Sequence, residues 1–131
     1  MNTFQKGNLA ESAIIKTALS KGYVVSVPFG DGSRYDLILD IQGELKKVQV
    51  KMGCLSKDQS YISFNTCSNN KGYNRQGYHG EVDFIAVYNP DFDSCYLIPI
   101  EETGVSNMKL RLTAPNNNQS KGINFAETYK F

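Results

Sequence analysis

The chain has 131 residues, with 14 Lys and Arg against 13 Asp and Glu, so its formal net charge is +1. Apolar residues make up 40% and charged residues 21%, which excludes a wholly disordered chain, and the length fits one domain over residues 1–131. No apolar run approaches the ~18 residues that cross a bilayer, and no apolar signal core follows Met1. We therefore expect a cytoplasmic protein with no membrane partner.

The balanced total hides a segregation of charge along the chain. Residues 45–57, 68–80 and 105–122 contain Lys or Arg and no carboxylate, whereas residues 81–102 contain carboxylates and no Lys or Arg. Such segregation favours a basic face for a phosphate backbone, with an acidic remainder.

The first predicted element is a helix over Leu9–Lys21, where apolar residues recur at three- and four-residue spacing. Asn8 is the expected N-cap, Glu11 completes a loose capping box, and Gly22 ends the helix.

Segments rich in β-branched and aromatic residues follow, mostly joined as hairpins, which predicts an α+β fold with a mixed sheet and helices at its faces. Two stretches, 67–80 and 115–122, contain many glycine or asparagine residues, and we expect them to be irregular loops. The predicted strands are 23–28, 35–41, 45–51, 61–66, 82–88 and 95–100, with a further one at Lys109–Arg111.

The hairpin of residues 36–51 carries the chemistry. Glycine at the first turn position is typical of a type II′ turn, so we place the turn at Gly43–Glu44. Asp36 then lies opposite Lys51, and alternation along the strands puts Asp36, Gln49 and Lys51 on one face. The apolar residues Leu37, Leu39, Ile41, Val48 and Val50 point to the other face and form core.

These side chains predict a site for a divalent cation. Asp36 provides hard oxygen ligands for Mg²⁺, Gln49 an amide oxygen, and Val50 a backbone carbonyl. Lys51 can stabilise developing charge or orient an attacking water.

Asp36 and Gln49-Val50-Lys51 resemble the Asp and acidic-X-Lys motif of the PD-(D/E)XK nuclease superfamily, with glutamine in the acidic position. Members often add a glutamate on the first helix, which the resemblance places at Glu11. Segments 7–11, 81–88 and 95–100 are similar to the branch that contains an intron homing endonuclease. The resemblance covers most of residues 7–100 and implies a restriction-endonuclease-like fold over the single domain.

The resemblance implies a metal-dependent, site-specific double-stranded DNA endonuclease of the intron homing kind. It would use Mg²⁺, or Mn²⁺ in its place, and leave a 5′-phosphate. Cutting two strands requires two active sites, so we expect a homo-oligomer, either a dimer or a tetramer, and a long target favours a higher symmetric assembly.

The loop at about 67–80 mixes basic and aromatic residues, and we expect it to enter a DNA groove, with Arg75 as base reader and Lys71 as phosphate contact. Residues from about 101 form a C-terminal extension, in which Lys109 and Arg111 point one way on a strand. The predicted DNA-binding residues are Lys71, Tyr73, Arg75, Tyr78, His79, Lys109 and Arg111.

Two alternatives stay open at this point. A Holliday-junction resolvase shares the helix glutamate and the core motif but recognises junction shape. A catalytically degenerate nuclease-fold protein is the other, because Gln49 removes one negative charge from the site and so weakens metal binding.

Overall fold

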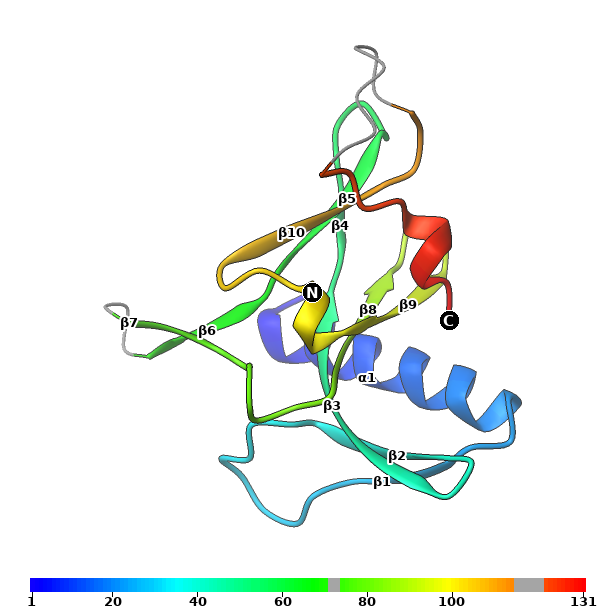
Figure 1. Cartoon of the computed structure of the whole chain (residues 1–131), viewed down its shortest axis with the longest axis vertical. Coiled ribbons are helices and arrows are strands. Elements are labelled where there is room, and N and C mark those ends of the chain that lie inside the picture. Colours follow the sequence, from blue (N-terminus) through cyan, green and yellow to red (C-terminus); the bar gives the residue numbers. More distant parts are fainter. Residues whose placement is uncertain (71–73, 115–121) are drawn as a thin grey trace.

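The nine-residue strand β3 (Glu44–Met52) lies in the centre of the computed structural model, which describes residues 1–70, 74–114 and 122–131. It pairs antiparallel with β2 (Leu37–Ile41) on one side and parallel with β8 (Phe84–Asn89) on the other. The sheet has the order β1-β2-β3-β8-β9, with β1 (Val24–Ser26) and β9 (Ser94–Pro99) at its edges. This mixed sheet confirms the predicted α+β fold (Figure 1).

Helix α1 (Thr3–Ser20) covers one face of this sheet (Figure 1). Its buried side chains, Ala10, Ile14 and Ala18, pack against a layer that includes Leu37, Leu39, Val48 and Val50. None of the described helices is long and apolar enough to cross a membrane.

The helix begins six residues earlier than the sequence pattern predicts. Asn2 is the N-cap: its side chain accepts the N–H of Gln5 at 2.9 Å, and the Gln5 side chain accepts the N–H of Asn2 at 2.9 Å. The prediction of Asn8 as N-cap was therefore wrong. Residues 3–8 are exposed, and the single large apolar side chain among them, Phe4, makes no periodic pattern.

A second, three-stranded sheet packs over the opposite face of the central sheet. Its order is β10-β5-β4, formed by β10 (Asn107–Arg111), β5 (Tyr61–Asn65) and β4 (Cys54–Leu55). Ile62 and Leu110 are fully buried there, against Ile85 and Ile98 of the central sheet. Two short 3-10 helices, η1 (Ile100–Glu102) and η2 (Ala126–Tyr129), complete this layer.

The β2–β3 hairpin turns one residue earlier than predicted. Ile41 pairs with Glu44, and the turn residues Gln42 and Gly43 have φ of 55° and 88°, as a type I′ turn requires. The side chain of Asp40 accepts the N–H of Gly43 at 2.9 Å, which stabilises this turn. Because each partner moves by two residues, the side chains keep the faces that the sequence pattern predicts.

The stretch 67–80, expected to be an irregular loop, contains a hairpin. Strands β6 (Cys67–Asn70) and β7 (Asn74–Gly77) pair antiparallel and extend away from the body of the protein (Figure 1). The segment from about 101, expected to be an extension, is part of the core, because β10 pairs with β5 and η2 buries Ala126 and Tyr129. Few large apolar side chains occur in residues 67–80, so hydrophobic patterning gives little signal of the hairpin, whereas Met108 and Leu110 alternate with polar residues in β10.

Gly53 connects β3 to β4, and its position between the two sheets makes a testable prediction. A Cβ there would lie 2.6 Å from Ile62 Cγ2 and 2.7 Å from Val87 Cγ1. Gly53→Ala should lower the free energy of unfolding by about 1–3 kcal/mol through overpacking. The matched control is Gly7→Ala in α1, where nothing lies within 4 Å, and it should raise stability by about 0.5–1 kcal/mol. Denaturant titration of both variants measures the two effects, and an unchanged Gly53→Ala would contradict the tight approach.

Candidate active site

Asp36 lies where β2 separates from β3. Its N–H donates to the carbonyl of Val48 at 2.8 Å, and its Oδ2 accepts the N–H of Val50 at 2.9 Å. Since β2 begins only at Leu37, the Val50 N–H has no β2 backbone partner, and the Asp36 carboxylate takes that place. The strand backbone thus holds this carboxylate in position.

Glu11 reaches the same place from α1. A cavity of about 230 Å³ is lined by Glu11 and Asp36, together with residues of the 27–35 segment that connects β1 to β2. Burial raises the pKa of Glu11, and the negative charge of Asp36 raises it further. Burial also raises the pKa of Asp36, against the smaller lowering effects of the Val50 N–H and of Lys51. Two partly desolvated carboxylates therefore face one cavity, an arrangement that a bound cation stabilises.

Gln49 and Lys51 point to the face of the sheet opposite α1, because their neighbours Val48 and Val50 pack against the helix. The Gln49 amide Nε2 lies 3.4 Å from the Val50 carbonyl oxygen. The two uncharged groups predicted to bind metal are thus adjacent. A half-turn of the amide exchanges its nitrogen and oxygen, which allows Gln49 to present an acceptor.

The Lys51 ammonium is directed toward the β6–β7 hairpin. Its Nζ donates to the hydroxyl of Tyr78 at 3.1 Å and to the carbonyl of Cys67 at 3.4 Å. Neither Lys51 nor Gln49 lines the cavity of Glu11 and Asp36, although the charge of Lys51 lowers the pKa of Asp36. The structure therefore brings Glu11 and Asp36 together and places Lys51 close by, held by other partners.

The predicted DNA-binding residues lie in different surroundings. Lys71 and Tyr73 lie outside the described residues. Arg75 lies on β7, and only its backbone is described. Tyr78, expected on a surface loop, is 3% exposed and belongs to the core.

The other predicted contacts are more accessible. His79 is exposed, with Nε2 3.2 Å from the carbonyl oxygen of Thr103. Lys109 and Arg111 lie on the outward side of β10, whose alternate residues Met108 and Leu110 are buried.

The sequence analysis missed Arg34, which joins the hairpin to the site. Its guanidinium forms an ion pair with Glu81 and donates to Ser68 Oγ at 2.6 Å. It also donates to the carbonyls of Gln76 at 3.2 Å and Gly77 at 2.8 Å. A single arginine among glycines carries no local signal of such long-range contacts.

The side chains of this site fit a hard divalent cation. Among the residues that the structure describes, no three His, Cys, Asp or Glu side chains gather as a metal-binding group. Glu11 and Asp36 supply two carboxylates, and Gln49 stands where a third is typical. Carboxylate, amide and carbonyl oxygens are nevertheless the ligand types that Mg²⁺ accepts, together with water and substrate phosphate.

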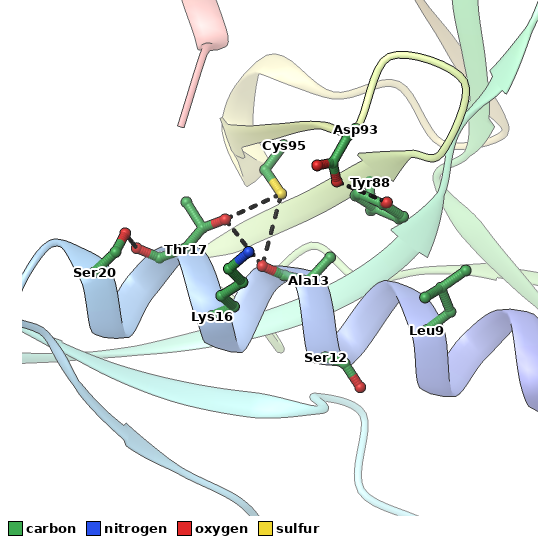
Figure 2. Close-up of a pocket in the computed structure, with 9 residues that line it drawn as sticks. All are labelled: Leu9, Ser12, Ala13, Lys16, Thr17, Ser20, Tyr88, Asp93 and Cys95. Carbon is green, nitrogen blue, oxygen red and sulfur yellow. Dashed lines mark hydrogen bonds between the residues drawn. The ribbon is translucent and has the colours of Figure 1, made fainter.

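A separate cavity of about 330 Å³ lies between α1 and the strands β8 and β9 (Figure 2). The hydroxyl of Thr17 donates to Cys95 Sγ at 3.3 Å, and Tyr88 donates to Asp93 at 2.9 Å. Burial raises the pKa of the Cys95 thiol, which keeps it protonated and unreactive. Of the predicted site residues that the structure describes, none lines this cavity.

Comparison with known proteins defines the class. The family model described as PD-(D/E)XK endonuclease matches residues 1–131, so this protein belongs to that family, whose members generally use divalent metal ions and act on DNA. The structure is similar to that of the bacterial homing endonuclease I-Ssp6803I. Its TM-score is 0.80 at 28% identity, and the match covers 99% of this chain and 89% of that one. This match confirms the predicted restriction-endonuclease-like fold. No curated protein sequence matches the chain.

The raised pKa of Asp36 predicts a pH-dependent cost in stability for the metal-free protein. Because its pKa is higher in the folded than in the unfolded state, the free energy of unfolding falls as pH rises from the unfolded pKa through the raised value. Asp36→Asn should reduce this fall, leaving the part that burial of Glu11 causes, and be more stable than the wild type at neutral pH. Unfolding in EDTA at several pH values between about 3 and 7 measures this.

The same variant tests metal binding without cleavage. Added Mg²⁺ should raise the stability of the wild type and leave that of Asp36→Asn unchanged. A stabilisation of Asp36→Asn as large as that of the wild type would show that Asp36 binds no metal.

Proposed function

We propose that this endonuclease hydrolyses double-stranded DNA at a specific site with Mg²⁺, as an intron-encoded homing endonuclease. The observation that carries the proposal is the meeting of Glu11 and Asp36 in one cavity at the open end of the β2–β3 hairpin, with Gln49 on the adjoining strand. The similarity to a bacterial homing endonuclease over 99% of the chain supports the choice of biological role.

The residues divide the chemistry between them. Glu11 and Asp36, with Gln49 and the Val50 carbonyl, would hold the cation, which would supply positive charge to neutralise the phosphate. Lys51 donates to a phosphate oxygen or orients the water. Water attacks phosphorus in line, the P–O3′ bond breaks, and the 5′-phosphate stays on one fragment and the 3′-hydroxyl on the other.

Gln49 makes metal binding dependent on the substrate. An amide brings no negative charge, so Gln49 adds none to the partly buried carboxylates of Glu11 and Asp36 and the exposed carboxylate of Asp31, which lines the same cavity. The DNA phosphate supplies the missing charge when it enters, and metal and DNA then bind cooperatively.

The outward side of the β10-β5-β4 sheet forms a second DNA contact. Lys109 and Arg111 line a groove of about 570 Å³ between β10 and residues 122–124. The Lys109 Nζ lies 4.6 Å from the ring centroid of Tyr61 on β5, which limits the freedom of this long side chain. These two cations contact phosphates or base edges, while the β6–β7 hairpin enters a groove through Arg75 and Lys71.

A functional assembly has at least two copies of the chain, because each active site cuts one strand. A single chain of 131 residues spans few base pairs, so a long target requires a symmetric dimer or tetramer.

Selection from a randomised double-stranded DNA library in Mg²⁺ tests the function. The wild type should cleave a restricted set of sequences, and a mobile four-way junction should be cut no faster than linear DNA. Preferential junction cleavage would make the protein a resolvase. Tight binding with no cleavage in Mg²⁺ or Mn²⁺ would make it a degenerate nuclease.

Variants of Gln49 test its role on the selected target. Gln49→Ala should lose about 10²–10³-fold in cleavage rate, because alanine provides no oxygen, whereas Gln49→Glu should remain active and bind metal more tightly without DNA. Asp36→Asn should abolish cleavage and spare DNA binding. Equal rates for Gln49→Ala and the wild type would show that this position binds no metal.

Lys109→Ala tests the second contact surface. Loss of one phosphate contact should weaken binding to all DNA sequences and lower the slope of log K against log salt by about 1. Lys16→Ala, an exposed lysine on α1, is the control and should leave the slope unchanged. Loss of affinity for particular sequences only would instead identify Lys109 as a base reader.

A further inference from the structure

Lys51 is held by the base of the β6–β7 hairpin. Both of its hydrogen-bond partners lie there: Cys67 is the first residue of β6, and Tyr78 directly follows β7. The Nζ also lies 5.0 Å from the centroid of the Tyr78 ring. A lysine side chain has many rotamers of similar energy, so these contacts decide where its ammonium lies.

Tyr78 is itself fixed in place. Its side chain is 3% exposed, and the Arg34 guanidinium lies over its ring, with Cζ 4.2 Å from the centroid. Its carbonyl accepts the N–H groups of Glu81 at 3.0 Å and Val82 at 3.2 Å. The two cations near this one ring, Arg34 and Lys51, and the burial of the residue leave the hydroxyl little freedom.

Arg34 ties this tyrosine to both strands of the hairpin. Ser68, which it contacts, lies on β6, and the carbonyls of Gln76 and Gly77 belong to β7. Glu81 balances its charge and also accepts from Gln76 Nε2 at 3.2 Å. Any movement of the hairpin relative to the central sheet therefore moves Tyr78 as well.

We propose that Tyr78 is a positioning residue for Lys51, through which the β6–β7 hairpin sets the location of the catalytic ammonium. The inference rests on the proposed function, since it takes Lys51 to act on the phosphate. When the hairpin engages DNA, its base determines whether the ammonium is in place for cleavage. Recognition by the hairpin and the rate of the chemical step are coupled in this way.

A purely structural role is the competing account, because a buried tyrosine hydroxyl needs a partner whatever the function of that partner. The two accounts differ in what removal of the hydroxyl does. Loss of a structural hydrogen bond lowers stability alone, whereas loss of a positioning contact lowers the cleavage rate of DNA that is already bound.

The decisive variant is Tyr78→Phe, measured by single-turnover cleavage at saturating DNA with Mg²⁺, by DNA affinity with Ca²⁺ in place of Mg²⁺, and by thermal unfolding. We expect the rate to fall by about ten- to a hundredfold, with the dissociation constant within about twofold of the wild type. Tyr129→Phe is the matched control: this tyrosine is also buried, its hydroxyl donates to Glu102 at 2.8 Å, and its rate should be unchanged.

Lys51→Met separates failure of the inference from failure of the proposed function. If Lys51→Met cleaves like the wild type, the proposed function of Lys51 is wrong. If Lys51→Met is inactive while Tyr78→Phe cleaves at the wild-type rate, only the positioning role is overturned. Arg34→Lys, which keeps the charge and loses the multiple contacts to the hairpin, is a second variant in case Tyr78→Phe does not fold. It should also slow cleavage, and a wild-type rate there would count against the inference.

Discussion

The hydrogen bond from the Val50 N–H to the Asp36 carboxylate is the interaction on which the arrangement of the site depends. Strand β3 extends beyond the point where it pairs with β2, and Asp36, the residue before β2 begins, accepts this hydrogen bond. The Val50 N–H has no backbone partner on β2, and it instead holds the Asp36 carboxylate in position. On the other edge of β3, parallel pairing with β8 keeps Gln49 opposite Ile85 and Lys51 opposite Val87, so the strand cannot shift without disrupting the core.

The alternation of β3 explains why the sheet face of each of its residues could be predicted from the sequence. Apolar and polar residues alternate from Val48 to Lys51. Only the apolar set, Val48 and Val50, faces α1. The turn lies one residue earlier than predicted, and each pairing partner shifts by two residues, so the paired side chains of β2 and β3 keep their predicted faces. Patterning determines the face of a residue robustly, while the exact partner depends on turn geometry, here on the Asp40 side chain and the positive φ of Gln42.

The hairpin β6–β7 and its attachment could not be predicted in this way. Its strands are polar, so no periodicity distinguishes them from a loop. Tyr78 was taken for a surface residue because its neighbours are polar and glycine-rich, but Arg34 and Lys51, distant in the sequence, provide the cations that make its burial favourable. The pairing of Arg34 with Glu81 joins segments 47 residues apart and depends on the completed fold.

The way Arg34 holds the hairpin has a consequence for how this protein diverges. Two of its acceptors are backbone carbonyls, of Gln76 and Gly77, which every amino acid provides. Substitutions elsewhere in the hairpin leave those acceptors in place, so its attachment through Arg34 does not depend on which side chains it carries at positions 76 and 77. On the function proposed above, the hairpin residues that contact DNA can therefore change while the contacts that attach the hairpin to the central sheet are retained.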